Sequence, residues 1–305
     1  MSPRGKLVKS FAMITRHSLP MLLSFSLIRA YSLSNPMSET IMSENNSKFK
    51  LMKSLQLKKY RMKENLILVE GHRSVLDAIS NGLDPKLIFV TKKSFESPLG
   101  QQLYDTLCQK EELEIVPEHL MKSLTDTVHS QGVCAAFPIP NEPANLPPDA
   151  SLILICDSIS DPGNLGTIIR TAFGLGVDAI VLTEGSCDPY SPKVLRSSMG
   201  TAISPLVPIL QRSWSDIPEL LGVSFQVLVT DAGGVCYDEV DMCPTTALVL
   251  GSEATGVDVK AFQLQHATPI TIPMQRGLES FNVGVAASII LGEVSRQRRV
   301  SRFHQ

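Results

Sequence analysis

The chain has 305 residues, of which 43% are hydrophobic and 19% are charged, the balance of a globular protein of one or two domains. No stretch reaches the roughly 18 consecutive apolar residues that a membrane-spanning helix needs, so we expect no membrane insertion. The six cysteines form no CxxC pair, which argues against a bound metal and favours reduced thiols.

The charge is unevenly distributed along the chain. The formal net charge is −2, but residues 1–38 contain five cations and no acid, which leaves −7 for the remainder. An acidic remainder argues against a broad nucleic-acid-binding surface. Any contact with nucleic acid must therefore come from a local basic patch.

The leader, residues 1–35, is basic, contains several serines and lacks acids, the composition of an organellar transit peptide. The segment from Arg29 to Ser32 resembles a mitochondrial processing site that is cut after Tyr31. We expect mitochondrial import, with the chloroplast or an uncleaved basic tail as alternatives. A flexible segment is expected over residues 36–47.

A small α/β domain is predicted over residues 48–138. It begins with a helical segment at 48–63 that carries seven cations and no acid. Short apolar runs predict strands at 66–69, 87–90 and 113–116, and helical patterns lie at 74–80 and 99–110. Four prolines within residues 139–148 indicate an extended linker over 139–150.

A second domain is predicted over residues 151–305. Continuous apolar runs, typical of strands buried on both faces, alternate with helical patterns and predict a parallel sheet. These runs lie at 152–156, 179–182, 226–229, 247–250 and 267–272. The chain ends in a predicted helix at 282–299, whose stripe of Val283, Ala286, Ala287 and Ile290 suits helix packing in a dimer or in an ordinary core.

Three segments that follow these runs contain polar residues where ligands of open α/β sheets bind. In the first, Asn164 can cap a helix and precedes Arg170 by six residues. The second ends a buried strand at Gly251 and continues to Glu253. The third brings Ser280 and Asn282 to the start of the last helix. Taken singly, each segment is explained by helix capping or by a surface charge.

Taken together and in this order, the three segments resemble motifs 1, 2 and 3 of the SpoU family, the TrmH-like branch of the SPOUT RNA methyltransferases. The front domain resembles the RNA-substrate-binding module of that family at Lys53–Arg61, Val69–Arg73 and Gln131–Val133. The form of motif 3, with Gly277 three residues after Met274, resembles mitochondrial large-subunit rRNA 2′-O-methyltransferases.

The resemblance implies an α/β fold with a C-terminal trefoil-knotted SPOUT domain and a smaller N-terminal RNA-substrate-binding domain. It implies a homodimer that uses S-adenosylmethionine to methylate a ribose 2′-hydroxyl, here in organellar large-subunit rRNA. A tRNA ribose methyltransferase and a non-catalytic ribosome assembly factor are the alternatives. A dehydrogenase is excluded because no GxGxxG follows the first strand of the second domain.

The resemblance also assigns residues. The catalytic set is Arg170, Asn164, Glu253, Ser280 and Asn282. The cofactor is expected to contact Gly251, Ile272, Phe281, Leu250 and Met274. RNA phosphates are expected to meet Lys53, Lys58, Lys59, Arg61 and Arg73. No role follows for Arg276, which stands where relatives have a small residue or proline.

Overall fold

The computed structural model of the protein describes residues 40–107, 112–125, 130–252, 254–277 and 279–303. The predicted leader therefore lies outside the described residues. Within these ranges, no helix has the length and apolar character needed to cross a bilayer, and no cluster of His, Cys, Asp and Glu could hold a metal ion.

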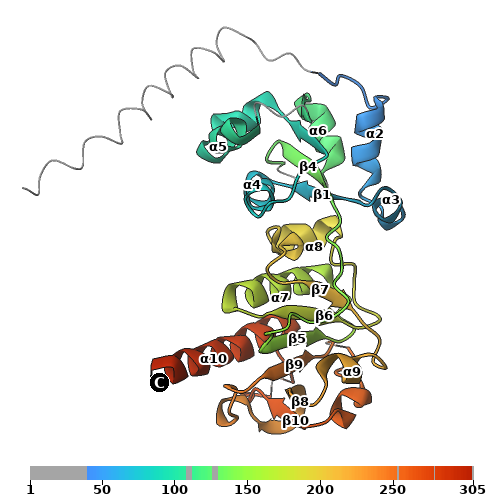
Figure 1. The fold of residues 1–305 in the computed structure, drawn as a ribbon. Helices are drawn as coiled ribbons and strands as arrows, with labels where there is room; N and C mark the ends of the chain where they lie inside the picture. Colours follow the sequence, from blue (N-terminus) through green and yellow to red (C-terminus); the bar gives the residue numbers. More distant parts are fainter. Residues whose placement is uncertain (1–39, 108–111, 126–129, 253, 278, 304–305) are drawn as a thin grey trace, which may run out of the picture. The chain divides into compact units, whose positions relative to one another are not determined.

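The first part of the described chain is a small mixed sheet in the strand order β1-β4-β2-β3 (Figure 1). Strand β4 pairs antiparallel with both of its neighbours, and β2 pairs parallel with β3. The strands are β1 (Leu66–Glu70), β2 (Leu87–Val90), β3 (Leu113–Ile115) and β4 (Val133–Pro138). The accompanying helices are α2 (Ser47–Ser54), α3 (Lys58–Glu64), α4 (His72–Ser80), 3-10 helix η1 (Lys92–Glu96), α5 (Pro98–Leu107) and α6 (Glu118–Leu124).

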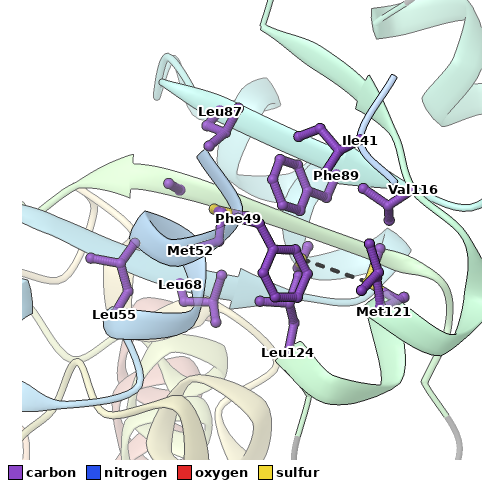
Figure 2. Packing of buried hydrophobic residues seen from close by; sticks show 13 residues of the cluster. Ile41, Phe49, Met52, Leu55, Leu68, Leu87, Phe89, Val116, Met121 and Leu124 are labelled. Carbon is purple, nitrogen blue, oxygen red and sulfur yellow. Dashed lines mark hydrogen bonds between the residues drawn. The ribbon is translucent and has the colours of Figure 1, made fainter. Parts of the chain in front are cut away.

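One face of this sheet forms a core with α2 and α6 (Figure 2). Phe49 of α2 stacks on Phe89 of β2, with ring centroids 6.2 Å apart. Cys134 of β4 lies 3.7 Å from Met121 of α6, measured between the sulfur atoms. Burial raises the pKa of the Cys134 and Cys156 thiols, so both act as small hydrophobic residues rather than as nucleophiles.

The prediction of one continuous helix over residues 48–63 is wrong, because the structure has two helices with a break between them. Asn46 caps α2, and α2 ends at Ser54; the buried Leu55 follows. Arg61 of α3 donates to the carbonyl oxygens of Leu55 and Gln56, at 3.0 and 2.8 Å. The second helix thus satisfies carbonyl groups that the end of the first leaves unpaired.

The second part is a six-stranded sheet in the order β10-β8-β9-β5-β6-β7, in which every neighbouring pair is parallel. The predicted parallel sheet is confirmed. Its strands are β5 (Leu152–Cys156), β6 (Ala179–Leu182), β7 (Ile209–Gln211), β8 (Gln226–Cys236), β9 (Thr246–Leu250) and β10 (Ala267–Thr271). The trefoil knot that the resemblance implies stays a prediction.

Helices connect these strands, and α10 ends the described chain beside α7 (Figure 1). The α-helices are α7 (Pro162–Leu175), α8 (Pro192–Ser197), α9 (Ile217–Leu221) and α10 (Val283–Phe303), and the 3-10 helices are η2 (Thr201–Ile203), η3 (Tyr237–Glu239) and η4 (Val259–Gln263). Gly166 lets α7 approach α8 closely, because a Cβ at this position would overlap the Ser197 side chain.

The proline-containing segment between the two sheets, residues 139–150, contains neither helix nor strand. Arg212, which follows β7, donates to the carbonyl oxygens of Pro143 and Ala144, at 2.9 and 2.7 Å, and pairs with Glu142. Leu146 and Ala150 pack against the core of the larger sheet. The segment is extended, as predicted, and is also fixed to the larger sheet.

Candidate functional site

A cavity of about 530 Å³ lies at the carboxyl ends of β9 and β10 and beside the middle of β8, just past the residues of β8 that pair with β9. All five residues predicted to contact the cofactor line it, namely Leu250, Gly251, Ile272, Met274 and Phe281. Ser280 of the predicted catalytic set lines it too. Residues far apart in the sequence therefore meet at the edge of the sheet where open α/β folds bind ligands.

Gly251 allows the chain to fold back on itself at the mouth of the cavity. Strand β9 is fully buried and ends at Leu250. Directly afterwards, Ser252 and Gly256 exchange backbone hydrogen bonds of 3.1 and 2.9 Å. A Cβ at Gly251 would overlap the backbone of Gly256 and Val257. Only glycine permits this close backbone approach, and the fold leaves the cavity beside it open.

The apolar stripe of α10 faces this cavity. Val283, Ala286 and Ile290 line it, and Ala287 is buried. Burial within the chain accounts for Val283, Ala287 and Ile290, and packing of this helix in a dimer stays a prediction. The residues that line the cavity supply an apolar wall opposite the backbone of the loops.

The first turn of α7 differs from the predicted capping pattern. The cap is Asp161, whose Oδ1 accepts from the backbone N–H of Asn164 at 2.8 Å, and the helix begins at Pro162. Asn164 lies inside the first turn, so its side chain is not needed as a cap. Its Oδ1 instead accepts from Nδ2 of Asn282, at 2.9 Å.

Asn282 also caps α10. Its Oδ1 accepts from the backbone N–H groups of Gly284 and Val285, at 3.0 and 3.3 Å. Ser280, for which helix capping was the alternative to a catalytic role, lines the cavity. One amide thus fixes the start of α10 and joins motif 3 to motif 1 beside the cavity.

One member of the predicted catalytic set, Arg170, stands apart from this arrangement. Arg170 is exposed on α7, does not line the cavity, and has no hydrogen bond or ion pair with any residue that the structure describes. Glu253 lies outside the described residues. The structure thus joins Asn164 to Asn282, places Ser280 on the cavity lining, and leaves the Arg170 side chain without a partner among the described residues.

Sequence reasoning missed Thr230 and Asp231, which also line the cavity. Asp231 is exposed, and its Oδ2 accepts from the backbone N–H of Gly233 at 2.9 Å. The sequence pattern could have identified them, because both residues follow the buried run at 226–229 and polar residues after such strands are ligand candidates.

The predicted RNA-binding cations fall into two groups. Lys53, Lys58, Lys59 and Arg73 are exposed. Lys53 pairs with Glu44 at 3.1 Å and Arg73 with Asp77 at 3.0 Å, both in solvent-exposed contacts that add little stability. The assignment of Arg61 to RNA binding is wrong, since its side chain is 3% exposed and bound to Asp188 and two carbonyl groups.

The cavity fits S-adenosylmethionine in size and chemistry. Its volume lies within the roughly 300–1,000 Å³ usual for small-ligand sites. The apolar wall of α10 and Phe281 suits a purine ring, while the Asp231 and Glu279 carboxylates suit hydroxyl and ammonium groups. The chain can therefore hold this cofactor with backbone, apolar side chains and acids alone.

Comparison with known families agrees with this geometry. Residues 151–292 match the SpoU rRNA Methylase family, and residues 46–135 match the MRM3-like substrate binding domain. The first match contains the cavity and its polar rim, and the second contains the exposed cations.

Individual relatives cover both parts of the chain. The mouse protein named "rRNA methyltransferase 3, mitochondrial" is 30% identical over 82% of this chain and 72% of its own length. The Bacillus subtilis 23S rRNA (guanosine(2553)-2′-O)-methyltransferase RlmP is 32% identical over 82% of this chain and 97% of its own length. A crystal structure of an AdoMet-bound rRNA methyltransferase from Sinorhizobium meliloti superposes with a TM-score of 0.74, at 27% identity over 84% of this chain and 97% of that chain.

Proposed function

We propose an rRNA substrate for this chain because it belongs to the SpoU rRNA methylase family, whose members are S-adenosylmethionine-dependent RNA 2′-O-methyltransferases. The observation that carries the proposal is the single cavity at which all five cofactor residues of the resemblance meet, with Ser280 on its lining. The front domain supports rRNA over tRNA, since it matches a substrate-binding domain shared with an rRNA methyltransferase. The intact motifs disfavour a non-catalytic assembly factor.

S-adenosylmethionine supplies an electrophilic methyl group when it is bound. The chain itself has to hold the ribose so that the 2′-oxygen approaches that methyl at roughly 3–3.5 Å. Ser280 is on the cavity lining, and the bonded pair of Asn164 and Asn282 lies next to it. Their hydroxyl and amide groups are suited to orient the ribose hydroxyls by hydrogen bonds.

Arg170 is proposed to bind the phosphate group next to the target ribose. A guanidinium with a pKa above about 12 is a poor base in water, so it is better suited to orientation than to proton abstraction. Two parallel hydrogen bonds to one phosphate would fix the sugar and stabilise negative charge on the 2′-oxygen. The exposure of Arg170 and its freedom from partners within the described chain support this role.

The direct test is methyl transfer from labelled S-adenosylmethionine to unmodified organellar large-subunit rRNA, with total tRNA as the competing substrate. We expect the label in one 2′-O-methylnucleoside of the rRNA. Label that appears only in tRNA would support the first alternative. Cofactor binding without transfer to any RNA would support the assembly factor.

We further propose mitochondrial import, on the basis of the acid-free leader and of relatives whose printed names are mitochondrial. N-terminal sequencing of the protein purified from its own cells should begin near Ser32. An intact Met1 or Ser2 on a cytosolic pool would reject import.

A homodimer is proposed as the active form. Arg170 does not line the cavity of its own chain, and Val285 on the neighbouring helix is 46% exposed. A second copy could bring another Arg170 to the cavity. Sedimentation should give twice the chain mass, and a heterodimer of Arg170→Ala with a cofactor-deficient Gly251 variant should recover part of the activity.

A further inference from the structure

A second cavity, of about 640 Å³, lies in the front domain and is lined by different residues from those of the cofactor site. It lies where α4, η1 and the start of β4 meet. We propose that it is a subsite for one unpaired nucleotide of the RNA substrate, an inference that rests on the proposed RNA methylation.

The first argument is Thr91, a residue of the cavity lining whose hydroxyl group is buried behind it. Thr91 is 2% exposed, and its Oγ1 is the single buried side-chain polar atom without a hydrogen-bond partner among the described residues. It stands at the start of η1, where a threonine usually accepts from a backbone N–H, yet it caps nothing. A buried hydroxyl without a partner is unfavourable, so it indicates a partner outside the chain.

The backbone around Thr91 is fixed. Its N–H donates to the carbonyl oxygen of Gly132 at 2.8 Å, and its own carbonyl accepts from Ser94 N and Oγ, at 3.0 and 2.7 Å. The hydroxyl is thus the one polar group of this residue without a partner in the described part of the chain, and a ligand would reach it through a small shift of the residues that cover it.

Gln131 supplies a second polar group whose orientation is determined. Its Oε1 accepts from the backbone N–H of His72 at 3.0 Å, and its amide nitrogen donates to no residue that the structure describes. The His72 ring is held as well, with Nε2 2.8 Å from the carbonyl oxygen of Ser94, which can only accept.

Two glycines lie directly against these groups. Gly132 and Gly71 have φ of +77° and +99°, conformations that favour glycine. A Cβ at Gly132 would overlap Thr91 Oγ1, and a Cβ at Gly71 would lie 3.2 Å from Gln131 Oε1. A larger residue at either position would crowd the two free polar groups.

The remaining lining indicates the class of ligand. Pro98 and the 40% exposed Leu99 offer an apolar surface for the face of a base. Lys93 offers one cation without an ion pair in the described chain, and Glu118 offers an acceptor for exocyclic amino groups. A carboxylate here disfavours an inorganic anion. An apolar face, neutral edge groups and one ammonium match an unpaired nucleotide, the form in which RNA sequence is usually read.

The test uses the full chain and fluorescence anisotropy with four nine-nucleotide RNAs that differ only in a central A, C, G or U, and with a blunt RNA duplex. Thr91→Val removes the hydroxyl and keeps the shape. We expect three- to tenfold weaker binding of the preferred single strand, the scale of removing one neutral hydrogen bond. The salt dependence should not change, since every phosphate stays bound as in the wild type, and the melting temperature should stay equal or rise.

Gln131→Met, at an exposed position, serves as the second variant and should weaken the same RNA. Thr125→Val is the matched control, because that buried hydroxyl already donates to the Met121 carbonyl, at 3.4 Å, and does not line the cavity. Wild-type affinity in both Thr91→Val and Gln131→Met would overturn the subsite, as would equal losses on the duplex. Methyl transfer to rRNA by the wild-type chain is measured in parallel, so a failed subsite and a failed proposed function give different results.

Discussion

Arg61 of α3 and Arg170 of α7 both carry a guanidinium group, yet their surroundings are opposite. Arg61 is 3% exposed, donates to two carbonyl oxygens and pairs with Asp188, which lies 127 positions further along the chain. Arg170 is exposed and has no partner in the part of the chain that the structure describes.

The difference separates a charge that holds the fold from one that is available to a substrate. A buried guanidinium with its donors occupied cannot meet a phosphate without breaking bonds that stabilise the native state. A free, exposed guanidinium can form a two-pronged contact with phosphate at little cost to the fold. Substitution of the first should therefore lower stability, and substitution of the second should lower turnover.

The largest expected effect is that of Arg61→Ala. Removing one partner of a buried ion pair costs about 3–5 kcal/mol of unfolding free energy, because the remaining charge and carbonyl groups lose their partners. Denaturant unfolding measures this loss. Arg73→Ala is the control, since its exposed pair with Asp77 should contribute under about 0.5 kcal/mol. An Arg61→Ala chain with wild-type stability but weakened RNA binding would restore the RNA-binding role.

Arg170→Ala should leave stability unchanged and slow methyl transfer by roughly 10²-fold or more, the scale of removing one preorganised donor. Cofactor affinity should persist, because Arg170 does not line the cavity. Arg170→Lys should recover little, since a point charge cannot reproduce a planar contact. Single-turnover transfer to the cognate RNA is the measurement. Near-normal rates in both variants would move the catalytic role to Ser280 and Asn282.

Gly251→Ala should lower both the stability of the chain and its affinity for S-adenosylmethionine. Even one added methyl group would overlap the backbone of Gly256 and Val257, so the loop beside the cavity has to move. We expect about tenfold weaker S-adenosylmethionine binding or worse, together with a lower melting temperature. Gly292→Ala on α10 is the control, because its Cβ meets no atom within 4 Å and should stabilise the helix slightly. Calorimetry with unaltered affinity would show that the loop does not shape the cofactor site.

Strands β5, β6 and β9 of the larger sheet were predictable because they are buried on both faces. The apolar runs at Leu152–Cys156 and Ala179–Leu182 coincide with β5 and β6, where side chains of both faces avoid water. Strand β4 was missed, since Cys134, Ala135 and Ala136 carry little β-propensity and the strand forms by pairing with β1 and β2.

The cofactor residues were predictable from the resemblance of the three segments to the family motifs. Gly251 follows the buried strand β9, Ile272 follows β10, and both reach the cavity as expected. Arg61 could not be distinguished from the exposed lysines around it, because its partner Asp188 is distant in sequence. Its burial depends on tertiary packing, which a local run of cations does not encode.

The smallest expected effect belongs to Lys58 and Lys59, which share α3 with Arg61 but are exposed. Lys59 lies over the Tyr60 ring, 4.7 Å from its centroid, an arrangement that leaves the ammonium accessible to a phosphate. Replacing both lysines by glutamine should lower RNA affinity at low salt. The slope of log affinity against log salt should flatten by something under one unit for each phosphate that is no longer neutralised. Stability and S-adenosylmethionine affinity should not change, in contrast to Arg61→Ala.

Lys86→Gln is the control, since Lys86 is an exposed lysine of the same domain, outside α3, that pairs with Asp84 at 3.4 Å. Equal slopes for the wild type and the double variant would mean that these two lysines face solvent and do not contact RNA phosphates. The RNA-binding surface would then lie elsewhere on the front domain.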